Sequence, residues 1–172
     1  MEVVMVPDST REEQLNRLMS LYERDLLRMS YVYLHDLALA EDAVQETFIK
    51  VYKNLDTFRG ESNEKTWLMR IAINTCKDMR RAGWFRFVDR RVSLDKLPQA
   101  YCAFLEEDNA ITTEIMLLPR KQMEVVLLYY YQGLTVYEIA KVLGIAVSSV
   151  SVRLKRAREQ LKKELEGGHC HG

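Results

Sequence analysis

The chain has 172 residues, 48% of them hydrophobic and 29% charged, and its 25 basic residues are balanced by 25 acidic ones. This length allows one fair-sized domain or two small ones, and a net charge of zero argues, on totals alone, against a nucleic-acid binder of the usual basic kind. The low content of Gly and Pro excludes collagen-like and linker-like chains, and no apolar run is long enough to span a bilayer.

The sequence also indicates a location. The first residues lack the basic segment and apolar core of a signal peptide. The three cysteines are too widely spread for a disulfide framework. A reducing cytoplasm suits such a chain, and we expect a cytoplasmic protein that does not itself insert into a membrane.

The charges are distributed unevenly along the chain. Residues 67–91 contain seven basic and two acidic side chains, and residues 153–163 contain six basic side chains and one acidic. The acidic residues gather elsewhere, in residues 41–46 and 106–114. A solvated helix face accounts for either basic patch alone, but two such patches in one short chain indicate a polyanion contacted at two places.

Three helices are predicted in the first half of the chain. Apolar residues at three- and four-residue steps predict an amphipathic helix over residues 11–34. A second helix follows, and Gly with small polar residues at positions 58–63 then indicates a loop. A third helix carries Trp67 and further apolar residues on one face and ends near Gly83, a typical stop.

The helical period is lost after the third helix, in a stretch that contains Pro98 and an acidic run. Ordinary loops have a median length of ~4–6 residues, so we interpret residues 84–111 as a flexible linker between two domains. The predicted domains cover residues 1–83 and 112–166, and residues 167–172 form a tail.

The C-terminal third predicts three further helices, and no strand pattern competes with them. Pro119 suits the first turn of the first helix, which Gly133 ends. Thr135 and Glu138 form a capping box at the start of a short second helix, which ends at Gly144. We therefore expect an all-α fold with two small helical domains.

The last two helices have the arrangement of a helix-turn-helix. Ala140 allows the helices to approach closely, Gly144 suits a left-handed turn, and Val150 packs the second helix onto the first. We expect the buried face of that second helix to continue as far as Leu165. Its opposite face carries serines and cations, which suit base edges and phosphates in a DNA major groove. These residues are Ser149, Ser151, Arg153, Lys155 and Arg156.

Three blocks of residues resemble those of the bacterial extracytoplasmic-function (ECF) sigma factors of the sigma-70 class. They are residues 40–52 (AEDAVQETFIKVY), residues 66–78 (TWLMRIAINTCKD) and residues 118–158. The order of the blocks, with the linker between the second and the third, makes the resemblance specific. It implies a promoter-specificity subunit of RNA polymerase, with no catalytic chemistry and no cofactor.

The resemblance implies a polymerase-binding role for the acidic helix. Asp42, Gln45, Glu46 and Phe48 would dock on the clamp helices of the largest polymerase subunit. An apolar seam with a carboxylate rim suits a basic helical partner. Part of Phe48 is also expected in the domain core.

The resemblance further implies two promoter-reading surfaces. The loop at residues 58–63 and the third helix would read the −10 element, where one base is flipped out of the stack, and the last helix would read the −35 element. Phe58 either packs under the loop or contacts a base. The −10 candidates are Phe58, Arg59, Asn63, Asn74, Lys77, Asp78, Arg80 and Arg81, and Arg158 joins the five −35 candidates above. Many relatives carry a basic residue at the position of Ser151 and a small polar one at that of Val152, which leaves the promoter preference open.

Two alternatives and one unexplained feature remain at this point. A stand-alone helix-turn-helix regulator would footprint a promoter without polymerase, and a helical adaptor would leave the basic residues 153–163 without a role. In the family, an anti-sigma factor commonly holds activity off, which implies such a partner here.

The tail residues His169, Cys170 and His171 are candidate metal ligands that adjacent positions alone cannot readily arrange in a tetrahedron. A fourth ligand from Cys76 or Cys102, a redox-sensing thiol and a disordered tail are the other interpretations.

Overall fold

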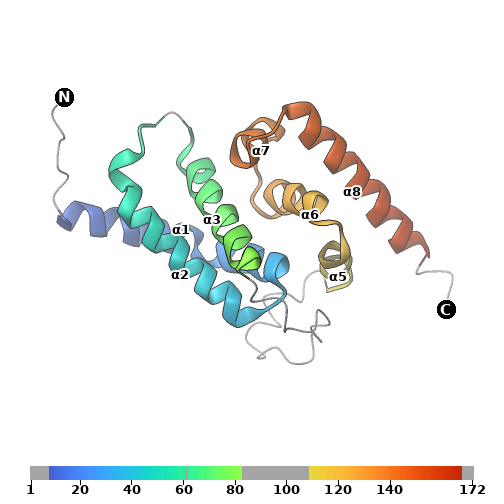
Figure 1. The fold of residues 1–172 in the computed structure, drawn as a ribbon, viewed down its shortest axis with the longest axis horizontal. Coiled ribbons are helices and arrows are strands. Elements are labelled where there is room, and N and C mark those ends of the chain that lie inside the picture. The colour runs from blue at the N-terminus through green and yellow to red at the C-terminus, as the bar shows by residue number, and fades with distance from the viewer. Residues whose placement is uncertain (1–7, 61, 83–108, 168–172) are drawn as a thin grey trace. The chain divides into compact units, whose positions relative to one another are not determined.

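The computed structural model describes residues 8–60, 62–82 and 109–167, and these residues form helices and turns with no strand among them. The described helices belong to two compact units, Met1–Trp84 and Phe85–Gly172 (Figure 1). The predicted all-α fold with two helical domains is therefore confirmed.

The first unit packs three long helices around one apolar core. They are α1 (Asp8–Leu34), α2 (Leu37–Asn54) and α3 (Glu64–Arg81), and each contacts the other two. Their fully buried side chains include Leu26, Met29, Val51, Leu68 and Ile73. The three helices predicted for this half are confirmed, and α1 begins slightly earlier than the periodicity indicates.

A tight turn folds α2 back onto α1. His35 adopts a left-handed conformation with φ of 59°, and its backbone N–H donates to the carbonyl of Tyr31 at 2.7 Å. Asp36 then caps α2, because its carboxylate accepts from the N–H of Leu39 at 2.9 Å. The end of one helix and the start of the next are thus satisfied within two residues.

The connection from α2 to α3 begins with a short 3₁₀ turn, η1 (Leu55–Thr57). Gly60 follows with φ of +71°, a backbone conformation that favours glycine. Asn63 ends the loop and caps α3, accepting from the N–H of Lys65 at 2.9 Å. The predicted loop at residues 58–63 is therefore present, with a defined cap at its far end.

The second unit contains α5 (Asn109–Leu117), α6 (Arg120–Val126), η5 (Leu127–Tyr131), α7 (Val136–Leu143) and α8 (Val147–Gly167). α5 begins inside the stretch assigned to the linker, so residues 109–111 are helical. The segment η5 is a π-helical turn that continues α6, with the N–H of Gln132 donating to the carbonyl of Leu127 at 3.2 Å. Gly133 then ends this helical run with φ of +65°.

The helix-turn-helix is formed by α7 and α8. Both bonds of the predicted capping box are present: Thr135 N–H donates to Glu138 Oε2 at 2.8 Å, and Glu138 N–H donates to Thr135 Oγ1 at 3.2 Å. Gly144 adopts the left-handed conformation with φ of 65°. Ala140 and Val150 are buried at the contact between the helices. The motif is therefore confirmed in its cap, its turn and its packing.

The predicted buried face of α8 ends sooner than the sequence indicates. Val150, Leu154 and Ala157 are buried, but Leu165 is 37% exposed. The reason is length, because the 21 residues of α8 span about 30 Å. The seven-residue α6 and eight-residue α7 beside it are much shorter. The last turns of α8 therefore extend beyond α6 and α7, and α5 lies beside Gln160, Leu161 and Glu164.

Candidate functional site

The outer face of α2 carries most of the predicted polymerase-binding residues. Asp42 and Gln45 are exposed and Glu46 is half-buried. These residues and Ile49 are spaced three and four apart, so they share one helix face. Ile49 is 48% exposed, and the same spacing could have identified it from the sequence. The face thus combines carboxylates with an exposed aliphatic side chain.

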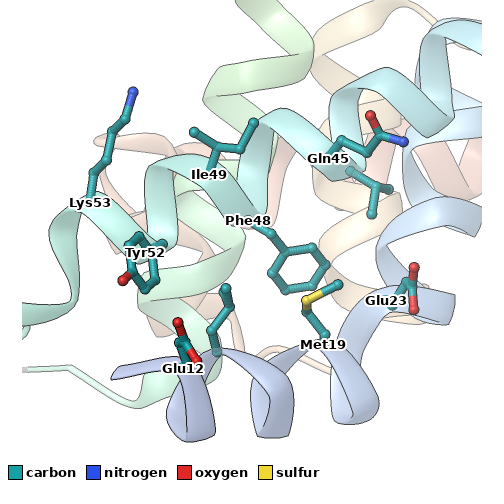
Figure 2. A pocket seen from close by; sticks show the side chains of 10 residues that line it. Glu12, Met19, Glu23, Gln45, Phe48, Ile49, Tyr52 and Lys53 are labelled. Atoms are coloured by element: carbon teal, nitrogen blue, oxygen red, sulfur yellow. The ribbon is translucent and has the colours of Figure 1, made fainter. Parts of the chain in front are cut away.

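Phe48 lies underneath this face. Its side chain is only 4% exposed, and Figure 2 shows its ring directed toward Met19 of α1. It lines a groove of about 540 Å³ between α1 and α2, together with residues that include Leu15, Val44 and Tyr52. Phe48 therefore belongs to the core and the groove lining, as expected for part of its side chain. Gln45 is exposed but also lines this groove, whereas Asp42 and Glu46 do not line it.

The loop before α3 is closed by an aromatic contact. The rings of Phe58 and Trp67 are 5.0 Å apart at an interplanar angle of 39°, a tilted arrangement that stabilises aromatic pairs. Of the two interpretations of Phe58, packing is the one that the contacts favour. Arg59 and Asn63 are exposed on the loop, and the side-chain oxygen of Asn63 is already used as the cap of α3.

The remaining −10 candidates lie on the second half of α3. Asn74, Asp78 and Arg81 are exposed. Asp78 also lies 3.9 Å from the ammonium of Lys50 on α2, and the guanidinium of Arg80 lies 5.6 Å from the centre of the Tyr33 ring. The structure thus presents Asn74 and Arg81 outward, whereas Asp78 and Arg80 also contact other helices of the same unit.

The remaining −10 candidate, Lys77, is half-buried on α3. It lies three residues after Asn74, so the two side chains share a helix face. Lys77 therefore stays a candidate with partial exposure.

The −35 candidates on α8 fall into two rows instead of one. At about 100° per residue, Ser149, Arg153 and Arg156 form one row, and Ser151, Lys155 and Arg158 form another on the opposite flank of the buried face. Val152 lies between the rows and is 47% exposed. The hydroxyl of Ser151 donates to the carbonyl of Val147 at 3.2 Å, which uses its only donor within the helix.

Arg158 is held by the π-helical turn. Its Nε donates to the Tyr130 hydroxyl oxygen at 2.7 Å, and its guanidinium lies 5.4 Å from the ring centre of Tyr129. The hydrogen bond to Tyr130 raises the pKa of Arg158 above its ordinary value. The sequence could not indicate this contact, because it depends on a π-helical turn that periodicity does not reveal.

The remaining chemical candidates provide no reactive centre in the described part of the chain. Cys76 is buried, with its Sγ 3.5 Å from the Ser30 hydroxyl, and burial raises the pKa of its thiol to about 11. Among the described residues, no group of His, Cys, Asp and Glu could hold a metal ion. His169, Cys170, His171 and Cys102 lie outside the described residues.

None of the described helices has both the length and the apolar character needed to cross a membrane.

Comparison with known families decides the identity of this arrangement. A family model described as Sigma-70 region 2 matches residues 18–86, and one described as Sigma-70, region 4 matches residues 108–161. The chain belongs to the sigma-70 family. The first match includes α2, α3 and the loop between them, and the second includes the helix-turn-helix.

Curated relatives place this sigma factor in the ECF class. It is 32% identical over 162 residues to the ECF RNA polymerase sigma factor SigW of Bacillus subtilis (strain 168), which covers 86% of this chain and 87% of the relative. It is 33% identical over 159 residues to the RNA polymerase sigma-H factor of Pseudomonas aeruginosa, covering 84% and 82%. The chain is thus a transcription initiation factor, not an enzyme, and its partners are core RNA polymerase and promoter DNA.

Solved structures show the same fold. CnrH, solved in complex with the cytosolic domain of CnrY, has a TM-score of 0.71 at 24% identity and covers 91% of this chain and 90% of that one. The sigma factor RpoE from Bartonella quintana, solved with the anti-sigma factor NepR, has a TM-score of 0.73 at 24% identity, covering 90% and 98%. The stand-alone regulator and the adaptor are not favoured, because both sigma regions are present in this chain.

Proposed function

We propose that, in the first unit of this sigma factor, α2 binds the polymerase and α3 binds the promoter. The observation that carries the proposal is that outward carboxylates lie on α2, whereas the outward Asn74 and Arg81 lie on α3. A basic helical partner complements the first surface, and DNA complements the second. One compact unit can therefore bind both at once.

The polymerase-binding surface consists of Asp42, Gln45, Glu46 and Ile49. The clamp helices of the largest polymerase subunit dock on it, with the exposed Ile49 supplying apolar contact beside the carboxylates. A helix that packs its apolar side on such a surface gains burial, and its basic side chains meet the acidic rim. Phe48 supports the surface from inside.

The promoter −10 element is read by the loop at residues 58–63 and by α3. Extruding a base from the stack costs a few kcal/mol, which hydrogen bonds to the base edge and stacking must offset. Asn74 can donate to and accept from such an edge. Arg59 and Arg81 contact phosphates, which position the protein without specifying sequence.

The promoter −35 element is read by α8 in the major groove. The row formed by Ser149, Arg153 and Arg156 faces the DNA, because it does not contain the Arg158 that Tyr130 holds. The neutral total charge of the chain makes binding by the free protein weak. Strong recognition then occurs only within the polymerase complex.

We also propose an anti-sigma partner and a cytoplasmic location. CnrH and RpoE were solved with the cytosolic domain of CnrY and with NepR, and activity in the ECF class is commonly held off in this way. A membrane-linked anti-sigma factor would hold this protein near the membrane until an envelope or stress signal releases it.

Two substitutions test the division of work. Glu46→Arg places a cation opposite basic clamp helices, so core binding should fall by roughly tenfold or more, with promoter opening lost as a consequence. Asn74→Ala should reduce promoter opening by a similar factor while core affinity stays unchanged. Asn16→Ala removes an equally exposed amide from α1 and serves as the matched control. Equal loss of core binding and opening in Asn74→Ala would contradict the assignment.

A further inference from the structure

The helix α1 contacts the far end of the loop between α2 and α3 through a bidentate ion pair. Arg17 donates from Nη1 to Glu64 Oε1 at 2.9 Å and from Nη2 to Glu64 Oε2 at 2.6 Å. Glu64 is the first residue of α3 and directly follows the cap Asn63. This hydrogen bonding raises the pKa of Arg17 above its ordinary value.

The same helix holds the near end of the loop. Arg11 donates to the carbonyl oxygen of Tyr52 at 2.9 Å, one of the last α2 carbonyls that lack a partner within the helix. Its guanidinium also lies 3.2 Å from the carboxylate of Asp56 in η1 and 5.0 Å from the ring centre of Tyr52. Arg11 thereby fixes the point at which the chain leaves α2.

The two arginines are placed to act on opposite sides of the loop. They are six residues apart, so their side chains leave α1 about 120° apart around the helix axis. One therefore reaches α2 and η1, and the other reaches α3. Between these anchors lie Gly60, with its positive φ, and Phe58, which packs on Trp67.

We propose that Arg17, through Glu64, and Arg11, through Tyr52 and Asp56, are positioning residues for −10 recognition. They hold the two ends of the loop at residues 58–63 at the separation that base capture requires. This inference rests on the proposed role of that loop. Neither arginine contacts DNA in this account, because each acts through the residues at the loop ends.

The expected effects separate this role from a general contribution to stability. Arg17 and Glu64 side chains are 49% and 30% exposed, and exposed ion pairs contribute little to stability. Recognition is far more sensitive, because a misplacement of about 1 Å can reduce a rate by roughly a hundredfold. Loss of the pair should therefore affect opening much more than unfolding.

The first measurement needs no promoter. Amide exchange is followed by NMR in the full chain for Phe58, Lys65 and Trp67, whose N–H groups bond at the loop ends. Arg17→Ala and Glu64→Gln should each raise exchange roughly two- to fivefold, the factor expected for an exposed ion pair. Their combination should add little to either alone, and Glu13→Gln, which removes another exposed carboxylate from α1, should change nothing. Unchanged exchange in Arg17→Ala would overturn the proposal.

The second measurement uses the reconstituted holoenzyme on a promoter that it transcribes. Arg17→Ala should reduce opening by about tenfold, core affinity should stay unchanged, and the loss should be smaller on a template whose −10 element is already impaired. The double variant Arg17→Glu with Glu64→Arg, in which the two charges are swapped, should open the promoter better than Arg17→Ala. A loss of stability alone would not predict this recovery. Full opening in Arg17→Ala, or equal loss of core binding, would contradict the proposal.

One further variant separates this inference from the role on which it rests. Arg59→Ala changes the loop itself. If Arg59→Ala lowers −10-dependent opening while Arg17→Ala and Glu64→Gln do not, the proposed positioning role of Arg17 is wrong and the loop still reads the promoter. If Arg59→Ala has no effect on opening, the proposed function of the loop is contradicted together with the inference.

Discussion

The guanidinium of Arg158 donates a hydrogen bond from Nε to the hydroxyl oxygen of Tyr130 at 2.7 Å. This contact joins the middle of α8 to the π-helical turn that ends the α6 run. It gives Arg158, a basic residue of α8, an intramolecular partner. The helix α8 is therefore fixed to its own domain by one of its cations.

Removing the acceptor of this hydrogen bond tests its role. Tyr130→Phe keeps the ring and should lower the free energy of unfolding by about 0.5–1 kcal/mol, the ordinary contribution of such a bond. Chemical denaturation of the full chain measures the change. Arg158→Ala should destabilise the protein to a similar extent. A neutral Tyr130→Phe together with loss of promoter binding in Arg158→Ala would contradict a structural role for Arg158.

The salt dependence of promoter binding distinguishes the two rows of α8. Arg156→Ala should weaken holoenzyme binding uniformly across promoters and reduce the slope of log affinity against log salt by about 1, because one phosphate contact is lost. Lys121→Ala removes the same charge from an exposed position of α6 and should leave the slope unchanged. Identical slopes for wild type and Arg156→Ala would exclude a phosphate contact at this position.

The capping box predicts a stability effect at the start of α7. Thr135→Ala removes the acceptor for the Glu138 N–H and should cost about 1 kcal/mol of unfolding free energy. Thr135→Ser keeps a hydroxyl and is the matched control, with stability close to that of the wild type. Thermal and urea unfolding measure both variants, and equal stability of the two variants would show that the cap contributes nothing.

The buried thiol of Cys76 makes stability depend on alkaline pH. Burial raises its folded-state pKa from 9.0 to about 11. Between those values the folded state binds more protons than the unfolded state, so this contribution is complete below pH 9 and is lost as pH rises toward 11. Its full size is about 2–3 kcal/mol, at 1.36 kcal/mol per pKa unit.

Unfolding free energies from pH 8 to pH 10.5 test this linkage. The wild type should lose more stability over this range than Cys76→Ala, in which the thiol is absent. Parallel pH profiles for the two proteins would contradict the shifted pKa of Cys76.

Local signals in the sequence were sufficient for much of the fold. The Thr135 capping box and the left-handed Gly144 are determined within a few residues, so their types and spacing reveal them. The burial of Leu165 depends on the lengths of neighbouring helices, and here the periodicity was misleading. The π-helical turn depends on how α6 packs, and no residue type within the turn indicates it.

In the candidate site, too, some features follow from local sequence and others depend on how the helices pack. The outward placement of Asp42 and Gln45 follows from helical spacing, and so does the burial of Phe48 on the apolar side of the same helix. The contacts of Arg17 with Glu64 and of Arg158 with Tyr130 join residues 47 and 28 positions apart. Such pairs are visible only once the helices are packed, and both change what the charged residues are available to do.

Run-off transcription with purified core polymerase tests the central claim most directly. Templates carry promoters from the protein's own genome, and polymerase is assayed with and without the chain. We predict discrete transcripts only when both are present, and weaker transcripts with Asn74→Ala and with Arg156→Ala. Absence of specific initiation from every such promoter would contradict it, as would equally tight promoter footprints by the chain alone.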